Sequence, residues 1–327
     1  MAQQEFLIIT QEEIEGNFSM SDFIPVVEEG FREFARGRVT IPPKVVFEVR
    51  SGAMACIPAY AAGSDALTIK IGNHRDDNPA KGLPYISGAQ VFLYDSETGL
   101  PLSLMDGTSI TALRTGAMGG VAAKYLARPD SHVVGIIGAG VQGRSNLAAL
   151  DRLFDIHTVY VAERHDEARD RYIREMSERL GLDIKPATIE EAARKSDILA
   201  CVTGTSTPLV KAQWLHPGMH ITTIGSDGPE KQEVETEVLK RSRIFLDWFD
   251  QCEYLGDISQ PLQRGELSRE DIAGELGHVI LGQIEGRQSD DQITLFDASG
   301  PGFLDSVSAK MIYRAALEKG LGTKAHL

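Results

Sequence analysis

The chain has 327 residues, of which 42% are hydrophobic and 24% are charged, and its formal net charge is −14. This length suffices for two domains with separate cores, and the composition is typical of a soluble globular protein. The negative charge argues against nucleic-acid and anionic-membrane partners, because both need a basic face. The early residues are acidic rather than signal-like, no apolar run is long enough to span a bilayer, and three scattered cysteines favour a reducing cytoplasm.

The first 108 residues or so predict a helix followed by a mostly antiparallel sheet. Apolar residues at helical spacing indicate one amphipathic helix over residues 12–39, with Ser19 or Ser21 as its N-cap. Short β-rich runs then alternate with turn residues such as Gly, Asn, Asp and Pro. The predicted strands are residues 44–50, 53–60, 66–72 and 89–95.

From Ser109 onward the pattern changes to alternating helices and buried strands. A small-residue helix over 110–127 precedes continuous apolar runs that should be parallel strands buried on both faces. These runs are residues 132–138, 157–162, 197–204, 220–225, 243–249 and 293–299, and a long helix over 302–322 follows them. The α/β pattern predicts a Rossmann-type doubly wound domain plus an α+β substrate and dimerisation domain. We expect the latter to comprise residues 1–118 and 303–327, and the dinucleotide domain to comprise residues 119–302.

A G-x-G-x-x-G pattern lies where the strand over 132–138 passes into a helix. Its glycines are Gly138, Gly140 and Gly143, with Val141 and Gln142 between them. The first glycine permits a tight turn, the second lets a pyrophosphate approach the backbone, and the third lets the helix pack on the strand. The helix N-terminus offers free N–H groups to phosphate. Alone such a pattern is weak, but its place between a strand and a helix predicts a dinucleotide site.

The next strand ends at Glu163, twenty residues after Gly143. A carboxylate there can accept hydrogen bonds from both ribose hydroxyls and repels a 2′-phosphate, which favours NAD. Arg164 follows directly and could pair with a 2′-phosphate, so NADP stays open. The alternative interpretation of Glu163 is an exposed acid that caps a helix.

Several stretches together resemble the ornithine cyclodeaminase/μ-crystallin family, and within it the archaeal-type alanine dehydrogenase branch. The resemblance covers nearly the whole chain. The stretches are IPAY (57–60), KIGNHRDDNPAKGLP (70–84), MDGTSITALRTGAMGG (105–120), GAGVQG (138–143), IGSDGPEKQEV (224–234) and ITLFDASGPGFLDSVSAK (293–310). The resemblance implies a homodimer built through the sheet of the first domain. It also implies an active site between the two domains and a small amino-acid or imino-acid substrate.

Two residues are candidate catalytic groups. Asp227 follows the predicted strand 220–225, where ligands of such folds bind, and it could exchange a proton with a substrate amine; otherwise it caps a helix over 228–241. Lys70 lies among apolar neighbours, where burial would lower its pKa and let it polarise a carbonyl or activate water; otherwise it is an edge lysine. The resemblance assigns catalysis to both.

Two further residues are candidate substrate ligands. Arg114 lies in an apolar helix, where an unpaired charge is costly, and its guanidinium suits bidentate binding of a carboxylate. Lys44 matches a position where similar proteins have Arg or Lys near the same carboxylate. We find no His, Cys and Asp combination at metal-ligand spacing, and we expect no metal.

These residues favour an NAD-dependent oxidoreductase, of the alanine dehydrogenase or imine reductase type, that interconverts a small L-amino acid and its imine or 2-oxo acid. The first alternative is ornithine cyclodeamination, in which ornithine gives proline and ammonia. Cyclodeaminases similar to this chain place Glu where it has Ala55, which disfavours a diamino substrate. The second alternative is a non-catalytic μ-crystallin-like binding protein, and the presence of both Lys70 and Asp227 counts against it.

Overall fold

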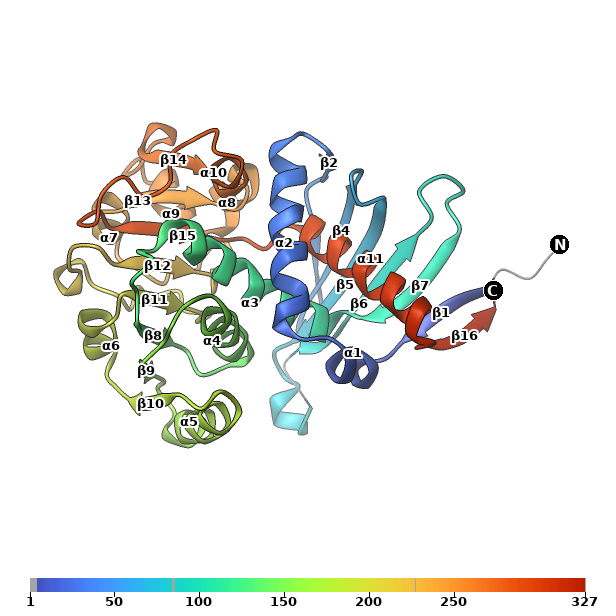
Figure 1. Ribbon diagram of the computed structural model, residues 1–327, viewed down its shortest axis with the longest axis horizontal. Coiled ribbons are helices and arrows are strands. Elements are labelled where there is room, and N and C mark those ends of the chain that lie inside the picture. Colours follow the sequence, from blue (N-terminus) through green and yellow to red (C-terminus); the bar gives the residue numbers. More distant parts are fainter. Residues whose placement is uncertain (1–4, 84–85, 227, 327) are drawn as a thin grey trace. The chain divides into compact units, whose positions relative to one another are not determined.

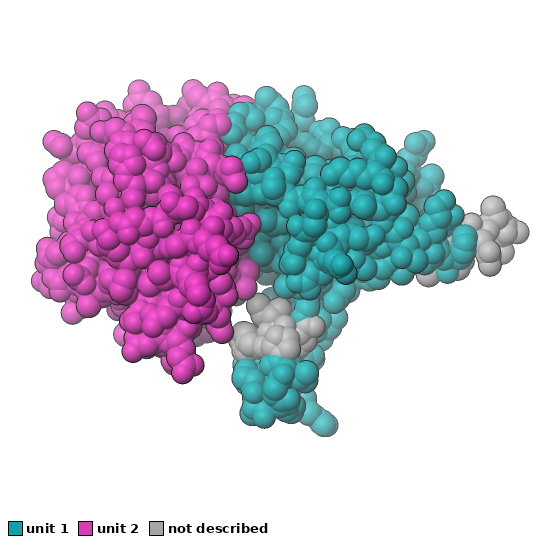
Figure 2. Space-filling view, turned by 60° about the horizontal axis from the view of Figure 1, so that its bottom comes forward, with its two compact units in different colours: residues 1–114, 301–327 teal, residues 115–300 magenta. Residues whose placement is uncertain are grey.

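The computed structural model describes residues 5–83, 86–226 and 228–326, and the chain divides into two compact units (Figure 2). Unit 1 comprises residues 1–114 and 301–327, and unit 2 comprises residues 115–300. The sequence placed these boundaries after residues 118 and 302. In the described part of the chain, no helix combines the length and apolar character needed to cross a membrane.

Unit 1 contains an eight-stranded sheet in the order β16-β1-β7-β6-β5-β4-β2, with β3 also paired to β4 (Figure 1). All neighbouring pairs are antiparallel except β1 with β7. Four of these strands were expected, but β1, β2, β7 and β16 were not, because β1, β7 and β16 pair over long range without a local pattern and β2 has only two residues. The strands are β1 (Glu5–Ile9), β2 (Val39–Thr40), β3 (Val45–Val49), β4 (Gly52–Ala61), β5 (Ala66–Arg75), β6 (Ile86–Tyr94), β7 (Pro101–Asp106) and β16 (Thr323–His326).

The single helix expected over residues 12–39 is wrong: it is two helices, α1 (Gln11–Asn17) and α2 (Met20–Ala35). Phe18 has φ −128° and ψ 140°, which is extended backbone and ends α1. Ser19 is the N-cap of α2, and its own N–H donates to the Asp22 carboxylate at 2.7 Å. This local hydrogen bond starts a new helix, although the apolar spacing continues across the break.

Two helices, α2 and the long C-terminal α11 (Gly302–Lys319), pack on one face of the unit 1 sheet (Figure 1). Alternate residues of β5 point to this face, so Thr68 and Lys70 are buried while their neighbours are only half-buried. Thr68 and Ser306 of α11 share a hydrogen bond of 2.6 Å between their hydroxyls. The C-terminal helix therefore belongs to unit 1, as part of the core around Lys70.

Unit 2 contains an eight-stranded, all-parallel sheet in the order β10-β9-β8-β11-β12-β15-β13-β14. This strand order confirms the predicted Rossmann-type doubly wound fold. The chain order reverses between β8 and β11, which is the place where such sheets bind ligands. The strands are β8 (Val133–Ile137), β9 (Thr158–Ala162), β10 (Asp183–Pro186), β11 (Ile198–Cys201), β12 (His220–Thr223), β13 (Arg243–Leu246), β14 (Ile272–Glu275) and β15 (Thr294–Asp297).

Helices cover both faces of this parallel sheet. One apolar cluster joins Ile136 of β8 to the helices α4 and α5, whereas the next residue, Ile137, belongs to a second cluster with α6. The helix over 228–241 that the sequence suggested is wrong, because only residues 236–240 are helical. The helices from α3, which begins in unit 1, to the end of unit 2 are α3 (Gly107–Leu126), α4 (Val141–Leu153), α5 (Asp166–Leu180), α6 (Ile189–Lys195), α7 (Thr236–Lys240), α8 (Phe249–Leu255), α9 (Ser259–Gln263) and α10 (Leu276–Ile280). Short 3₁₀ turns lie at Pro79–Lys81 in unit 1 and at Ala212–Trp214 and Arg269–Asp271 in unit 2.

Candidate functional site

The glycine motif forms the turn between β8 and α4 in unit 2. Gly138 has φ +108°, and a Cβ there would lie 2.9 Å from the Val202 carbonyl oxygen. A Cβ on Gly143 would lie 2.3 Å from the Gly138 carbonyl oxygen, so both positions require glycine. A Cβ on Gly140, by contrast, would meet nothing within 4 Å. The open side of the turn is therefore at Gly140, where the motif needs room for a phosphate.

The first turn of α4 is free to receive an anion. Gly140 is the N-cap of this 13-residue helix and has no side chain to satisfy the first N–H groups. Those groups and the positive end of the helix dipole favour phosphate. Val141 is 59% exposed, and the Gln142 side-chain oxygen is buried without a hydrogen-bond partner. An exposed apolar side chain and an unsatisfied amide oxygen at one turn fit a ligand-binding position.

Glu163 lies beside this turn at the end of β9. One carboxylate oxygen accepts a hydrogen bond from the Ala139 N–H at 3.1 Å, and the other accepts one from the His165 N–H at 3.1 Å. Each oxygen keeps a second lone pair for a ribose hydroxyl. Arg164 is exposed, and its Nε donates to the His165 ring at 2.9 Å. Of these two neighbours, Glu163 is the one that contacts the glycine turn.

In unit 1, Lys70 and Arg114 meet at a residue that the sequence analysis did not single out, Asp305. The Lys70 Nζ and the Arg114 Nε each donate to the same Asp305 oxygen, Oδ1, at 3.1 Å. These side chains come from β5, α3 and α11, and all three residues are at most 5% exposed. Asp305 lies in the quoted stretch 293–310, but no local pattern distinguishes it from a surface acid of a helix.

The charged side chains of this triad carry more positive than negative charge. Burial lowers the pKa of Lys70 to about 8; Asp305 opposes this shift, and the charges of Arg114 and Lys44 add to it. Burial alone would raise the pKa of Asp305, but Arg114 and Lys70 outweigh burial and hold it below its usual value. Asp305 is thus ionised, and with Lys70 protonated two buried cations share one anion. A bound carboxylate would complete the charge balance.

Lys44 lies next to the start of β3 and is half-buried. Its charge reaches Lys70, because it is one of the groups that lower the Lys70 pKa. The structure therefore brings Lys44, Lys70 and Arg114 into one electropositive region of unit 1. Asp227, the other predicted catalytic residue, lies outside the described residues. Its neighbour Ser226 follows β12 at the carboxyl edge of the unit 2 sheet.

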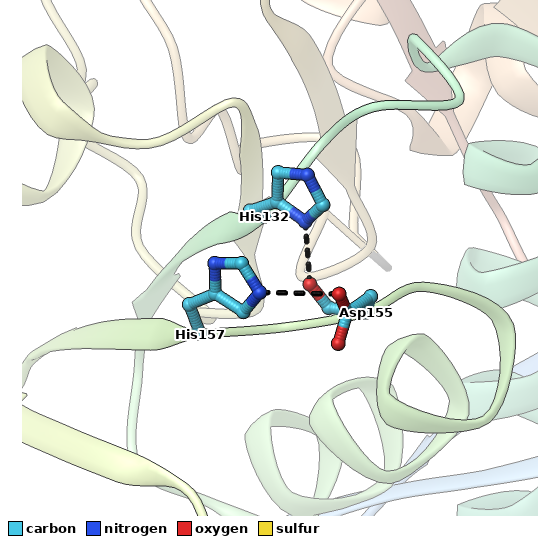
Figure 3. A group of neighbouring side chains, drawn as sticks. All are labelled: His132, Asp155 and His157. Atoms are coloured by element: carbon cyan, nitrogen blue, oxygen red, sulfur yellow. Dashed lines mark hydrogen bonds and ion pairs between the residues drawn. The ribbon is translucent and has the colours of Figure 1, made fainter.

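A group that the sequence analysis missed is formed by His132, Asp155 and His157 (Figure 3). His132 and His157 precede β8 and β9, so the group lies at the edge of the sheet opposite the glycine turn. Its residue types suit zinc. However, the His132 Nδ1 donates to the Asp155 carbonyl at 2.7 Å, and the His157 Nε2 donates to the Asp155 carboxylate at 3.1 Å. The histidine nitrogens that face Asp155 therefore already have hydrogen-bond acceptors. We interpret the group as a hydrogen-bonded surface cluster.

The Rossmann-type sheet and the glycine turn beside Glu163 are the features of a dinucleotide-binding fold, and the buried Lys70–Asp305–Arg114 triad belongs to unit 1. The profile of the ornithine cyclodeaminase/mu-crystallin family matches residues 4–320. The chain therefore belongs to this family, which confirms the resemblance seen in the sequence.

Three similar proteins cover almost the full length. An alanine dehydrogenase of Archaeoglobus fulgidus is 42% identical over 98% of both chains. The solved structure of an archaeal alanine dehydrogenase dimer with bound NAD has a TM-score of 0.94 and 41% identity, covering 98% of this chain and 99% of the other. The Δ1-pyrroline-2-carboxylate reductase of Thermococcus litoralis, solved with NADH and L-proline, has a TM-score of 0.94 and 37% identity, covering 97% and 99%.

Proposed function

We propose that this protein is an NAD-dependent oxidoreductase that interconverts a small L-amino acid and its imine or 2-oxo acid. The observation that carries the proposal is the buried pair of cations, Lys70 and Arg114, on the single carboxylate of Asp305. That arrangement suits a substrate with a carboxylate. The likeness to an alanine dehydrogenase and to a pyrroline-2-carboxylate reductase, both full-length, supports the same substrate class.

The residues of the glycine turn fit a dinucleotide. Gly140 leaves open space at the N-terminus of α4, and Glu163 presents lone pairs beside it. Gly138, Gly140, Val141, Gln142 and Gly143 would hold the pyrophosphate, and Glu163 the adenosine ribose. The bound nicotinamide would accept or supply the hydride. Two similar structures were solved with NAD or NADH, which supports NAD as the cofactor.

The remaining site residues divide between binding and proton transfer. Arg114 is anchored through its Nε, and its two terminal nitrogens have the geometry that a carboxylate binds. Lys44 adds positive charge to the same region. Lys70, with a pKa of about 8, can give or take a proton near neutral pH, which suits the addition of water to an imine. Asp227 exchanges the proton of the substrate amine.

Ala55 separates this reaction from ornithine cyclodeamination. It lies on the same face of the sheet as Lys70, on β4, two residues before the position that pairs with Lys70. Its cross-strand partners are Val46 and Gly72, neither of which has a carboxylate that could receive the far ammonium of ornithine. We therefore place a small or apolar substrate side chain there.

The experiment that tests the function is a cofactor-coupled screen of the purified protein. NADH oxidation is followed in two assays, one with ammonia plus a panel of 2-oxo acids and one with preformed cyclic imines. NAD reduction is followed with the matching amino acids. We expect turnover with a subset of these carboxylates. Proline and ammonia formed from ornithine, without net change in NADH, would favour the cyclodeaminase alternative. Absence of turnover with every compound would favour the non-catalytic binding protein.

Replacing Glu163 with Ala should narrow the preference for NADH over NADPH. In the unchanged protein we expect NADH to bind at least several-fold more tightly, because the Glu163 charge repels a 2′-phosphate. The measurement is a fluorescence titration with both cofactors. Glu178→Ala, an equal loss of charge at an exposed position of α5, is the control and should leave the preference unchanged. A preference for NADPH in the unchanged protein would mean that Arg164 decides the selectivity.

We also propose a homodimer through the face of the unit 1 sheet that α2 and α11 leave uncovered. Half-buried apolar side chains of β5 (Leu67, Ile69, Ile71) point to this face, and Phe47 of β3 is 45% exposed there. Exposed apolar residues gathered on one face commonly mark an interface between proteins. A dimer is named for the similar archaeal alanine dehydrogenase.

All three cysteines are free, which is consistent with the cytoplasm.

Light scattering at micromolar concentration should therefore give the mass of a dimer. Ile69→Glu, which places a charge in the middle of this face, should shift the mass toward the monomer. Leu317→Glu is the control, because Leu317 is an equally apolar residue, 57% exposed, on α11. A monomer for the unchanged protein would refute the dimer.

A further inference from the structure

Three buried carboxyl groups lie at the carboxyl edge of the unit 2 sheet, in the region from which the Asp227 loop starts. Asp297 ends β15, Asp257 follows α8, and Glu233 lies in the segment after β12. All three are at most 1% exposed. None of them was predicted from the sequence to have a role.

Each carboxylate holds the main chain of the next one. Asp297 accepts hydrogen bonds from the N–H groups of Asp257 at 3.0 Å and Ile258 at 3.1 Å. Asp257 in turn accepts from the N–H groups of Glu233 at 2.8 Å and Val234 at 2.9 Å. The three residues thus form a chain of contacts that runs from the end of a central strand to Glu233.

Glu233 completes this chain at the loop that carries Asp227. One carboxylate oxygen accepts from the N–H groups of Ile224 at 3.2 Å and Gly225 at 2.7 Å, directly after β12. The other accepts from the N–H and hydroxyl of Thr203 at 2.5 and 2.8 Å, after β11. One side chain therefore ties together the ends of two neighbouring strands.

The backbone at this point has no room to shift toward β11. A Cβ added to Gly225 would lie 1.9 Å from the Thr203 carbonyl oxygen, so the two strand ends are packed main chain against main chain. Ser226 is fully buried, and its hydroxyl donates to Asp257. The chain is thus held at two successive residues, at Gly225 through its backbone N–H and at Ser226 through its side-chain hydroxyl.

Three buried carboxyl groups are an inefficient source of folding stability. Burial raises the pKa of Glu233 to about 7, of Asp257 to about 7 and of Asp297 to about 8. Well-packed apolar residues commonly stabilise a core as well as buried charges do. What apolar residues cannot do is accept several backbone N–H groups in a fixed geometry. The network is therefore better explained by the position that it imposes on the chain.

We propose that Glu233 is a positioning residue for catalysis: supported by Asp257, it fixes the start of the loop that places Asp227 for proton transfer. The inference rests on the proposed function, because it needs Asp227 to be the acid–base group. A displacement of about 1 Å of such a group can lower a rate by about 100-fold. Glu233 thus affects turnover without contacting the substrate or the cofactor.

The test is Glu233→Gln, which keeps the size of the side chain but replaces one acceptor oxygen with an NH₂ group. The new NH₂ group would face backbone N–H groups and could not accept their hydrogen bonds. The end of one of the two strands, β11 or β12, would therefore lose its hydrogen bonds to this side chain. We expect kcat to fall by roughly 10- to 100-fold, while the substrate KM and the affinity for NADH change little. Glu233→Asp keeps a carboxyl group with two acceptor oxygens and should recover part of the loss. If Glu233→Gln does not fold, Glu233→Asp carries the test, with a smaller fall in kcat at unchanged KM.

The control is Asp197→Asn. Asp197 also accepts two backbone N–H groups, those of His132 and Val133 at 3.0 Å each, but at the opposite edge of the sheet. This variant should lose stability and keep its kcat. A double-mutant cycle with Asp227→Asn completes the test: Glu233→Gln should cause little further loss in that background.

Each outcome has a separate meaning. A wild-type kcat for Glu233→Gln, or an equal loss with and without Asp227, overturns the positioning role. A normal kcat for Asp227→Asn alone overturns the proposed function instead, because Asp227 is then not the acid–base group.

Discussion

Lys70→Met and Asp227→Asn should each lower turnover by at least about 100-fold and leave the binding of NADH nearly intact. Positioned acids and bases typically contribute about 10²–10⁴-fold to a rate. Methionine keeps the length of Lys70 without its charge, and asparagine keeps the shape of Asp227 without its ability to carry a proton. Neither residue belongs to the glycine turn, so a fluorescence titration of NADH should show little change beside the loss in steady-state kinetics.

Arg114→Ala provides the contrast to these two variants. Loss of the guanidinium should raise the apparent KM most strongly, because a substrate carboxylate loses its bidentate ligand. If Lys70→Met and Asp227→Asn both turned over at near the wild-type rate, the chemistry would have to take place elsewhere in the protein.

The pKa of about 8 for Lys70 also predicts how the rate depends on pH. In the direction of imine reduction, a protonated Lys70 is the useful form, so the rate should fall as pH rises through about 8. In the direction of amino-acid oxidation, the neutral amine is the useful form, and the rate should rise over the same range. In Lys70→Met the residual activity should lose this inflection in both directions.

Asp305→Asn should produce the second large effect, a loss of about 3–5 kcal/mol in the free energy of unfolding at pH 7. The variant leaves two buried cations, Lys70 and Arg114, without their shared anion, and an unpaired buried charge has a cost of that order. Chemical denaturation measures the loss. Asp65→Asn is the control. Asp65 is half-exposed and pairs with Lys310, which lies on α11 as Asp305 does, and we expect this variant to lose less than about 1 kcal/mol in the free energy of unfolding.

The sign of the pH dependence follows from Lys70. Asp305 is the strongest influence that raises the Lys70 pKa, so in Asp305→Asn this pKa falls further below 8. A lysine whose folded pKa lies below its unfolded value destabilises the protein while it is protonated. The extra loss in the variant should therefore be larger at pH 6 than at pH 9, where Lys70 is neutral in both proteins. An equal loss at both pH values would mean that Lys70 and Asp305 do not interact as described.

The sequence by itself predicted the doubly wound fold and the dinucleotide turn. Both are encoded locally: parallel strands buried on two faces read as continuous apolar runs, and the turn needs glycine at fixed offsets. The place of Glu163 beside the turn was also predictable, because the strand after the turn ends at a fixed distance along the chain. Helix boundaries were predicted only in part: Ser19 was named as an N-cap, but the apolar spacing continues across residues 12–39 and does not show that a first helix ends at Asn17.

Only the tertiary structure revealed the buried acids that pair with the candidate residues or hold the backbone near them. Asp305 is 235 residues from Lys70 in the chain and 191 from Arg114, and it meets both because α11 returns to the sheet of unit 1. Glu233, Asp257 and Asp297 likewise come together from separate loops at one edge of a sheet. An acid in a helix or loop has the same local signature whether it faces water or a buried lysine. The burial and partners that give these residues their charge state arise only when distant segments pack together.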